Sequence, residues 1–147
     1  MNPIDPTALE AKVDARYRTL LILWAAMLTS IAVYAFVAFF AAPAAGAGSP
    51  VILLALVGAG LLPLAASFFL KLIFLAQAAR QRNPNLVHTA HIIAFALCDA
   101  TAILGLVACF ITRNTYSWAL FVLAAAGMLL HVPRRAQILD ALYGNQP

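Results

Sequence analysis

The sequence predicts an all-α integral membrane protein: an antiparallel four-helix bundle with a short N-terminal helix at the membrane surface. Of the 147 residues, 65% are hydrophobic and only 10% are charged, whereas a soluble domain carries about 25% charged residues. The mean hydropathy of +0.94 agrees with this. Four long apolar runs are separated by short turns. We therefore expect one membrane domain over residues 1–147, with much of its surface facing lipid.

The first 17 residues predict a short amphipathic helix that rests in the membrane interface. Asp5 is a suitable N-cap, and Pro6 suits the first helical position. Asp14 and Arg18 are four residues apart, a spacing that favours an ion pair on one face of a helix. We expect this helix to lead into the first membrane span.

The four predicted spans cover approximately residues 19–42, 51–77, 86–112 and 116–132. A proline- and glycine-rich turn separates the first two spans, and residues 79–85 form the one polar loop. The second span contains Pro63, which is expected to kink it. Lys71 lies near the far end of the same span, where its ammonium group is expected to reach the interface.

The basic residues predict the orientation of the spans. With four spans, eight of the nine lysines and arginines lie on one side of the membrane, and only Arg113 lies on the other. Cytoplasmic segments of membrane proteins are enriched in lysine and arginine. We therefore expect a multi-pass protein of the inner (plasma) membrane, with both termini in the cytoplasm.

Asp99 lies near the middle of the third predicted span, whereas the other acidic residues lie near the chain ends. An acid at bilayer depth is costly and is usually retained for a function. Without water beside it the neutral carboxyl is favoured, which suits reversible binding of a proton or cation. The alternative is a protonated Asp99 that hydrogen-bonds another helix, for example at Ser67, Ser30 or Thr29.

Three histidines could lie at one depth, because the fourth span returns His131 to the level of His88 and His91. Three imidazoles at one level are weak candidates for binding a metal or haem. Since no fourth ligand accompanies them, we predict no metal site and no cofactor. Cys98 and Cys109 are eleven residues apart, about 16 Å along a helix, too far apart for an intrachain disulfide.

The sequence favours a non-enzymatic function. It contains no phosphate-binding glycine loop, no nucleophile elbow and no paired carboxylates. The net charge of +4 is modest, and no basic stripe with interleaved aromatic residues indicates nucleic-acid binding. Small residues on spans two to four favour close helix packing. The expected partners are the lipid bilayer and other membrane subunits, in a larger complex or a homo-oligomer.

Residues 79–107 resemble the hairpin of the rotor-ring proteolipids, the c subunits of rotary ATP synthases. The run Ala-Arg-Gln-Arg-Asn-Pro at 79–84 is similar to the cytoplasmic loop of that family, and residues 96–107 are similar to its carboxylate helix. The resemblance implies that Asp99 is an ion-binding carboxylate. It also implies that the loop residues make contacts on the cytoplasmic side: Arg80, Arg82, Asn83 and Pro84.

The resemblance supplies the alternative function, a proton- or cation-translocating proteolipid that uses Asp99. The chain departs from that family in span two, which keeps only Gly58 and Gly60 of the repeated glycine pattern. It also places its carboxylate on the third span, whereas tandem four-helix members carry it on an even-numbered helix. Over its whole length the chain is also similar to small four-span bacterial membrane proteins whose third helix centres on Cys-Asp or Cys-Glu.

Overall fold

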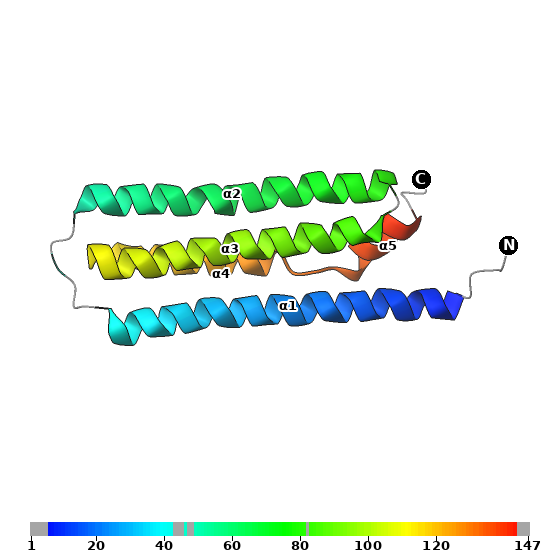
Figure 1. The fold of residues 1–147 in the computed structure, drawn as a ribbon, viewed down its shortest axis with the longest axis horizontal. Helices are drawn as coiled ribbons and strands as arrows, with labels where there is room; N and C mark the ends of the chain where they lie inside the picture. The colour runs from blue at the N-terminus through cyan, green and yellow to red at the C-terminus, as the bar shows by residue number, and fades with distance from the viewer. Residues whose placement is uncertain (1–5, 43–45, 47–48, 82, 144–147) are drawn as a thin grey trace.

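The computed structural model describes residues 6–42, 46, 49–81 and 83–143, and within them the chain forms helices and no strand. The element order is α1 (Pro6–Ala41), α2 (Pro50–Gln81), α3 (Pro84–Thr112), a 3-10 turn (Thr115–Ser117), α4 (Trp118–Leu130) and α5 (Arg135–Tyr143). Successive long helices run in opposite directions (Figure 1). The predicted all-α bundle is confirmed.

Three helical segments are long and apolar enough to cross a membrane: Val13–Ala41, Pro50–Gln81 and Asn85–Thr112. About 20 apolar residues suffice for a helix to cross the hydrocarbon core of a bilayer. Large apolar side chains on α1 and α2 are exposed at the surface of the bundle, among them Phe39 and Leu54. Such a surface suits lipid, so the chain is a membrane protein.

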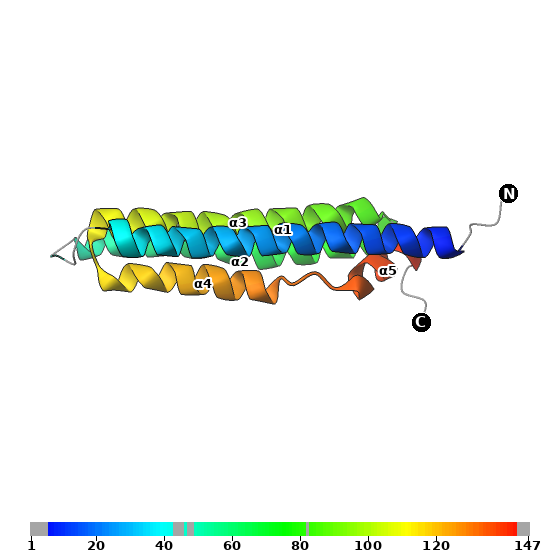
Figure 2. The same cartoon turned by 90° about the horizontal axis from the view of Figure 1, so that it is seen from below.

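Helix α3 is the centre of the bundle, since it packs against α2, α4 and α1. In Figure 1, α1 and α2 lie on opposite sides of α3, and Figure 2 shows α4 running alongside them. The main apolar core includes Phe95 and Ala102 of α3, together with Ile31 of α1 and Phe121 and Met128 of α4. The side chain of every residue in this core is nearly or fully buried.

Two glycines allow α2, α3 and α4 to approach closely. Leu120 of α4 is fully buried. Its Cδ2 would lie 2.7 Å from a Cβ added at Gly60 of α2, and its Cβ would lie 3.0 Å from one added at Gly105 of α3. The same approach lets the Thr101 hydroxyl donate a hydrogen bond to the carbonyl oxygen of Gly60 at 3.0 Å. Small residues at such contacts are how membrane helices pack tightly.

The predicted short N-terminal helix and the first span form one continuous helix, because α1 runs from Pro6 to Ala41 without a break. No glycine or internal proline interrupts this segment, so nothing separates the two parts. The predicted N-cap, Asp5, lies outside the described residues. The predicted pair of Asp14 and Arg18 does not form; Asp14 instead pairs with Arg135 of α5 at 3.0 Å.

The fourth predicted span, residues 116–132, is shorter as a helix than expected. Helix α4 has 13 residues, which is about 20 Å of helix against about 30 Å of hydrocarbon. After Leu130 the chain continues as a turn and an extended segment before α5 begins at Arg135. Pro133 ends the helical pattern because its ring cannot continue it.

The predicted polar loop, residues 79–85, is mostly helix. Helix α2 continues to Gln81 and α3 begins at Pro84, because alanine, arginine and glutamine favour helix. The Asn83 side chain caps α3 by accepting a hydrogen bond from the backbone N–H of Asn85 at 3.0 Å. Pro63, the proline expected to kink the second span, lies inside α2, which runs from Pro50 to Gln81 as one continuous helix.

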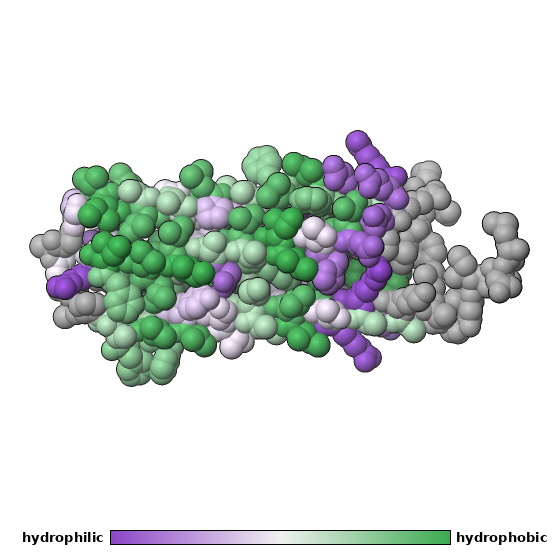
Figure 3. Space-filling model, viewed as in Figure 1, coloured by the Kyte–Doolittle hydropathy of each residue, from purple (hydrophilic) through white to green (hydrophobic). Residues whose placement is uncertain are grey.

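Hydrophilic side chains gather at one end of the bundle, beyond a long apolar belt (Figure 3). The first turns of α1, the end of α2 and helix α5 lie at this end (Figure 1). Helix α5 packs there through Ile138, which shares a second buried apolar cluster with Val13, Ala78 and Val87. We call this the α5 end of the bundle.

Candidate functional site

A buried polar cluster lies where α4 ends, between α2 and α3. We call it the Lys71 cluster: Ser67, Lys71, His91, His131 and Gln137. The side chains of Ser67, His91 and His131 are at most 1% exposed, and that of Lys71 is 8% exposed. Ser67 and Lys71 are four residues apart on α2, so both face the bundle interior. Lys71 therefore packs among the helices of the bundle and does not extend over its surface.

Hydrogen bonds fix the proton positions in this cluster. The Ser67 hydroxyl donates to the carbonyl oxygen of Leu64 at 2.6 Å. Because a hydroxyl has one hydrogen, His131 Nε2 must donate to Ser67 Oγ, at 2.9 Å. His131 Nδ1 is then an acceptor and receives a hydrogen bond from Lys71 Nζ at 3.5 Å. Cys98 Sγ makes a weak contact of 3.9 Å with Ser67 Oγ, which is the last contact in this series of hydrogen bonds.

The end of α4 is stabilised by groups from other helices. A helix leaves its last four carbonyls without helical partners, and within a membrane these must be satisfied by protein. The indole Nε1 of Trp24 on α1 donates to the carbonyl oxygen of Met128 at 2.8 Å. Lys71 places its ammonium beside His131, the C-cap of α4. A cation at a helix C-terminus is favoured by the helix dipole.

Lys71 has no carboxylate partner in the described part of the chain, where the one ion pair joins Asp14 and Arg135. The guanidinium of Arg134 adds a second positive charge near it. A buried ammonium without a counter-ion costs several kcal/mol. An ionisable group buried among membrane helices marks a candidate proton or ion site.

Two acceptor atoms at the edge of the cluster have no hydrogen-bond partner among the described residues: His91 Nε2 and Gln137 Oε1. The other ring nitrogen of His91, Nδ1, donates to the carbonyl oxygen of Val87 at 2.9 Å. The imidazole also packs edge-on against Phe95, with ring centroids 5.8 Å apart. Gln137 of α5 lies beside His91.

Asp99 lies apart from this cluster's hydrogen bonds. Its Oδ1 is buried and has no hydrogen-bond partner among the residues that the structure describes. Its neighbours one turn away, Phe95 and Ala102, are buried in the core, whereas Ile103 on the other side is 43% exposed. Asp99 therefore borders the core and the lipid-facing surface of α3.

The helix partners predicted for Asp99 make other contacts. Ser67 bonds Leu64 and His131, and the exposed Thr29 hydroxyl donates to the carbonyl oxygen of Ala25 on its own helix at 2.8 Å. Ser30 is half-buried. Within the described part of the chain, none of the three hydrogen-bonds Asp99 Oδ1.

The three histidines do not form a metal site. In residues 6–42, 46, 49–81 and 83–143, no group of three or more His, Cys, Asp or Glu side chains is placed to hold a metal ion. His91 and His131 both belong to the Lys71 cluster, but each uses a ring nitrogen in another hydrogen bond. His88 is half-buried and lies one turn from His91.

Three of the four loop residues that the rotor-ring resemblance implies lie at helix ends. Arg80 is exposed in the last turn of α2, and Asn83 and Pro84 start α3 as its cap and first residue. Arg82 lies outside the described residues.

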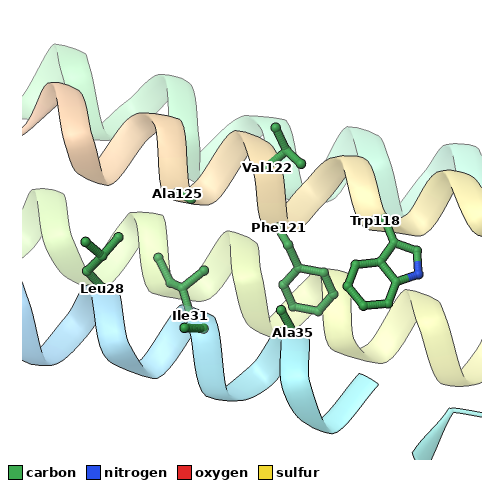
Figure 4. Close-up of a pocket in the computed structure, with 8 residues that line it drawn as sticks. Leu28, Ile31, Ala35, Trp118, Phe121, Val122 and Ala125 are labelled. Atoms are coloured by element: carbon green, nitrogen blue, oxygen red, sulfur yellow. The ribbon is translucent and has the colours of Figure 1, made fainter. Parts of the chain in front are cut away.

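An apolar groove runs along the bundle between α1 and α4 (Figure 4). It has a volume of about 330 Å³ and is lined by Leu28, Ile31, Ala32, Ala35, Trp118, Phe121, Val122 and Ala125. Its lining contains no ionisable group. The groove can therefore contact hydrocarbon, but it has no side chain for acid–base catalysis or metal binding.

Sequence reasoning found His91 and His131 only as weak metal ligands and missed Lys71 and Gln137 as cluster members. One signal was available: Gly60, Ser67 and Lys71 recur at spacings of seven and four on α2, which is the pattern of a buried helix face. Comparison with models of known protein families, with curated proteins and with solved structures finds no match for this chain.

Proposed function

We propose that the chain is a non-enzymatic membrane subunit that packs against other membrane helices, in a homo-oligomer or a larger complex. The observation that carries this proposal is Asp99, a half-buried acid whose Oδ1 has no hydrogen-bond partner in the described residues. A carboxyl at mid-membrane costs about 3 kcal/mol on insertion scales. A donor on a neighbouring helix would offset part of that cost, by about 0.6–2 kcal/mol.

The exposed surface of α1 and α2 suits contacts with other membrane helices. In the candidate spans, the most apolar windows of α1 and α2 are only 11% buried within one chain. In the membrane we place the chain as a four-pass protein of the inner membrane, with the α5 end on the cytoplasmic side. The basic residues at that end support this orientation.

Purification in a mild detergent tests the proposal, because detergent preserves contacts between membrane subunits. Native mass spectrometry of the full chain should show more than one copy or a co-purifying membrane protein. A stable monomer with no partner, found both in detergent and in lipid nanodiscs, would contradict it.

The second candidate function is proton or cation binding at Asp99, as in a translocating proteolipid. It is favoured by the same buried oxygen, which has no hydrogen-bond partner in the described residues, on a helix where the small residue Ala102 lies one turn away. Carbodiimides modify protonated carboxyls within lipid. We expect labelling of Asp99 that falls as pH rises and is blocked by a bound cation, with Asp99→Asn as the unreactive control. No labelling at any pH would rule this function out.

A further inference from the structure

One face of α3 is left uncovered by the other described helices. Its exposed side chains follow one another at spacings of three, four and seven residues, which places them on one stripe of a helix. They are Ile92, Ala96, Ile103, Val107 and Phe110. In Figure 2, α3 lies along one edge of the bundle and α4 along the opposite edge. We call this stripe the α3 outer face, and in a membrane it faces lipid.

Asp99 lies in the middle of the α3 outer face. Together with Ala100 it fills the gap in the stripe between Ala96 and Ile103, and both residues are half-buried. Asp99 is therefore partly accessible from the surface. No hydrogen bond from the described residues holds its Oδ1 inward. Because the terminal torsion of an aspartate is soft, rotation can bring either carboxyl oxygen to the surface.

A carboxyl at a surface that faces lipid needs a partner that both donates and accepts a hydrogen bond. Its neutral form is favoured there, because burying a charge in hydrocarbon is costly. A neutral carboxyl has one O–H donor and a carbonyl acceptor, and a second neutral carboxyl offers the same two groups. Two carboxyls that face each other therefore satisfy one another, since each donates its hydrogen to the carbonyl oxygen of the other.

We propose that the α3 outer face binds the same face of a second copy of this chain, in a two-fold dimer whose two Asp99 carboxyls hydrogen-bond each other. The basic residues give every copy the same orientation in the membrane. The two-fold axis is then perpendicular to the membrane, and the two α3 helices run in the same direction. A two-fold contact uses the same patch on both copies. The two Asp99 side chains therefore meet at one depth.

The residues around Asp99 allow two helices to come close. Ala96 and Ala100 are four residues apart, and small side chains at this spacing let the backbones of membrane helices approach each other. Apolar side chains such as Phe39 of α1 and Leu54 of α2 are also exposed, but they pack against lipid as well as against protein. The carboxyl therefore decides which exposed face pairs with its own copy.

Cysteine cross-linking of the full chain in lipid vesicles tests this contact, because a disulfide needs two Cα atoms within about 7 Å. We expect Ala96→Cys and Ala100→Cys to form disulfide-linked dimers. Leu54→Cys on α2 and Val122→Cys on α4 replace side chains that are also exposed, and these controls should give no dimer above the wild-type background. The two native cysteines, which set that background, are buried.

A bulky substitution tests the same contact without cysteine chemistry. Ala96→Leu should lower the dimer fraction by about fivefold or more, because added bulk overpacks a close contact. The matched control is Ala59→Leu, which enlarges an exposed alanine on α2 and should leave the dimer fraction unchanged. Förster transfer between labelled full-length chains in vesicles measures the dimer fraction.

The inference rests on the proposed function, since it names a second copy of the chain as the neighbour of Asp99. Cross-linking at Leu54→Cys or Val122→Cys as strong as at Ala96→Cys, or none at any site, would overturn it. An unchanged dimer fraction in Ala96→Leu would do the same. A chain that assembles through another surface, or with a different subunit, overturns only the α3 contact, whereas a monomer without any partner overturns the proposed function as well.

Discussion

Replacing Gly60 by alanine adds one methyl group at a close contact between α2 and α4. The new Cβ would lie 2.7 Å from Leu120 Cδ2, which would have to retreat by about 0.7 Å to reach ordinary contact at 3.4 Å. Leu120 has little freedom to do so, because it is fully buried and its own Cβ already faces Gly105 at close range. The helices must therefore separate, which also lengthens the hydrogen bond from Thr101 to the Gly60 carbonyl oxygen.

The expected cost follows from two opposing effects. Overpacking a core by one methyl group destabilises by about 1–3 kcal/mol. Replacing glycine by alanine within a helix stabilises by about 1 kcal/mol. Gly58→Ala, two residues away on the same helix, gains only the second effect because nothing lies within 4 Å of its added Cβ. The difference between the two variants isolates the overpacking, about 1–3 kcal/mol in the free energy of unfolding.

The assay is reversible unfolding in mixed micelles with increasing sodium dodecyl sulfate, followed by far-ultraviolet circular dichroism. We expect Gly60→Ala to unfold at a lower fraction of dodecyl sulfate than Gly58→Ala, and Gly58→Ala to equal or exceed wild type. Equal stabilities of the two variants would refute the close packing of Leu120 between α2 and α3.

Two further substitutions test the polar contacts. Ser67→Ala leaves the His131 Nε2–H without an acceptor and should destabilise the protein by about 1–3 kcal/mol. The control Thr29→Ala removes an exposed hydroxyl and should change the stability by less than about 0.5 kcal/mol. The same unfolding assay compares the two variants, and similar values would argue against the His131 hydrogen bond. Asp14→Asn removes an ion pair with Arg135 whose side chains are both 49% exposed, so the loss should be at most about 1 kcal/mol and should vanish in high salt. A larger, salt-independent loss would mean that Asp14 has another role.

The composition and the long apolar runs predicted the all-α class and the three long spans. A chain whose surface faces lipid needs long apolar segments, and it needs them in helices that satisfy their own backbone hydrogen bonds. The boundaries were predicted less well. The polar residues Arg80 and Gln81 favour a loop on hydropathy alone, yet both residue types also favour helix, and α2 continues through them. The fourth span was predicted through Val132 from hydropathy alone. Hydropathy carries no information on where a backbone leaves the helix when other helices satisfy its carbonyls.

The candidate site was predicted in part. Asp99 stands out in the sequence because a charged residue type inside an apolar run is unusual, and the structure leaves its oxygen unpaired in the described residues. The Lys71 cluster was missed because it joins residues separated by 60 and 64 positions, such as Lys71 and Ser67 with His131. Such pairings depend on helix register and on the end of α4, neither of which local spacing specifies.

The most direct test of the proposed function is the copy number of the chain in lipid bilayers, measured for wild type, Asp99→Asn and Asp99→Leu. Counting photobleaching steps of a labelled full-length chain, with any co-purifying subunit present, gives this number. We expect assembly in wild type and in Asp99→Asn, whose amide still hydrogen-bonds a neighbouring helix, and its loss in Asp99→Leu. Monomers in all three, or assembly that Asp99→Leu leaves intact, would contradict a role for Asp99 in joining subunits.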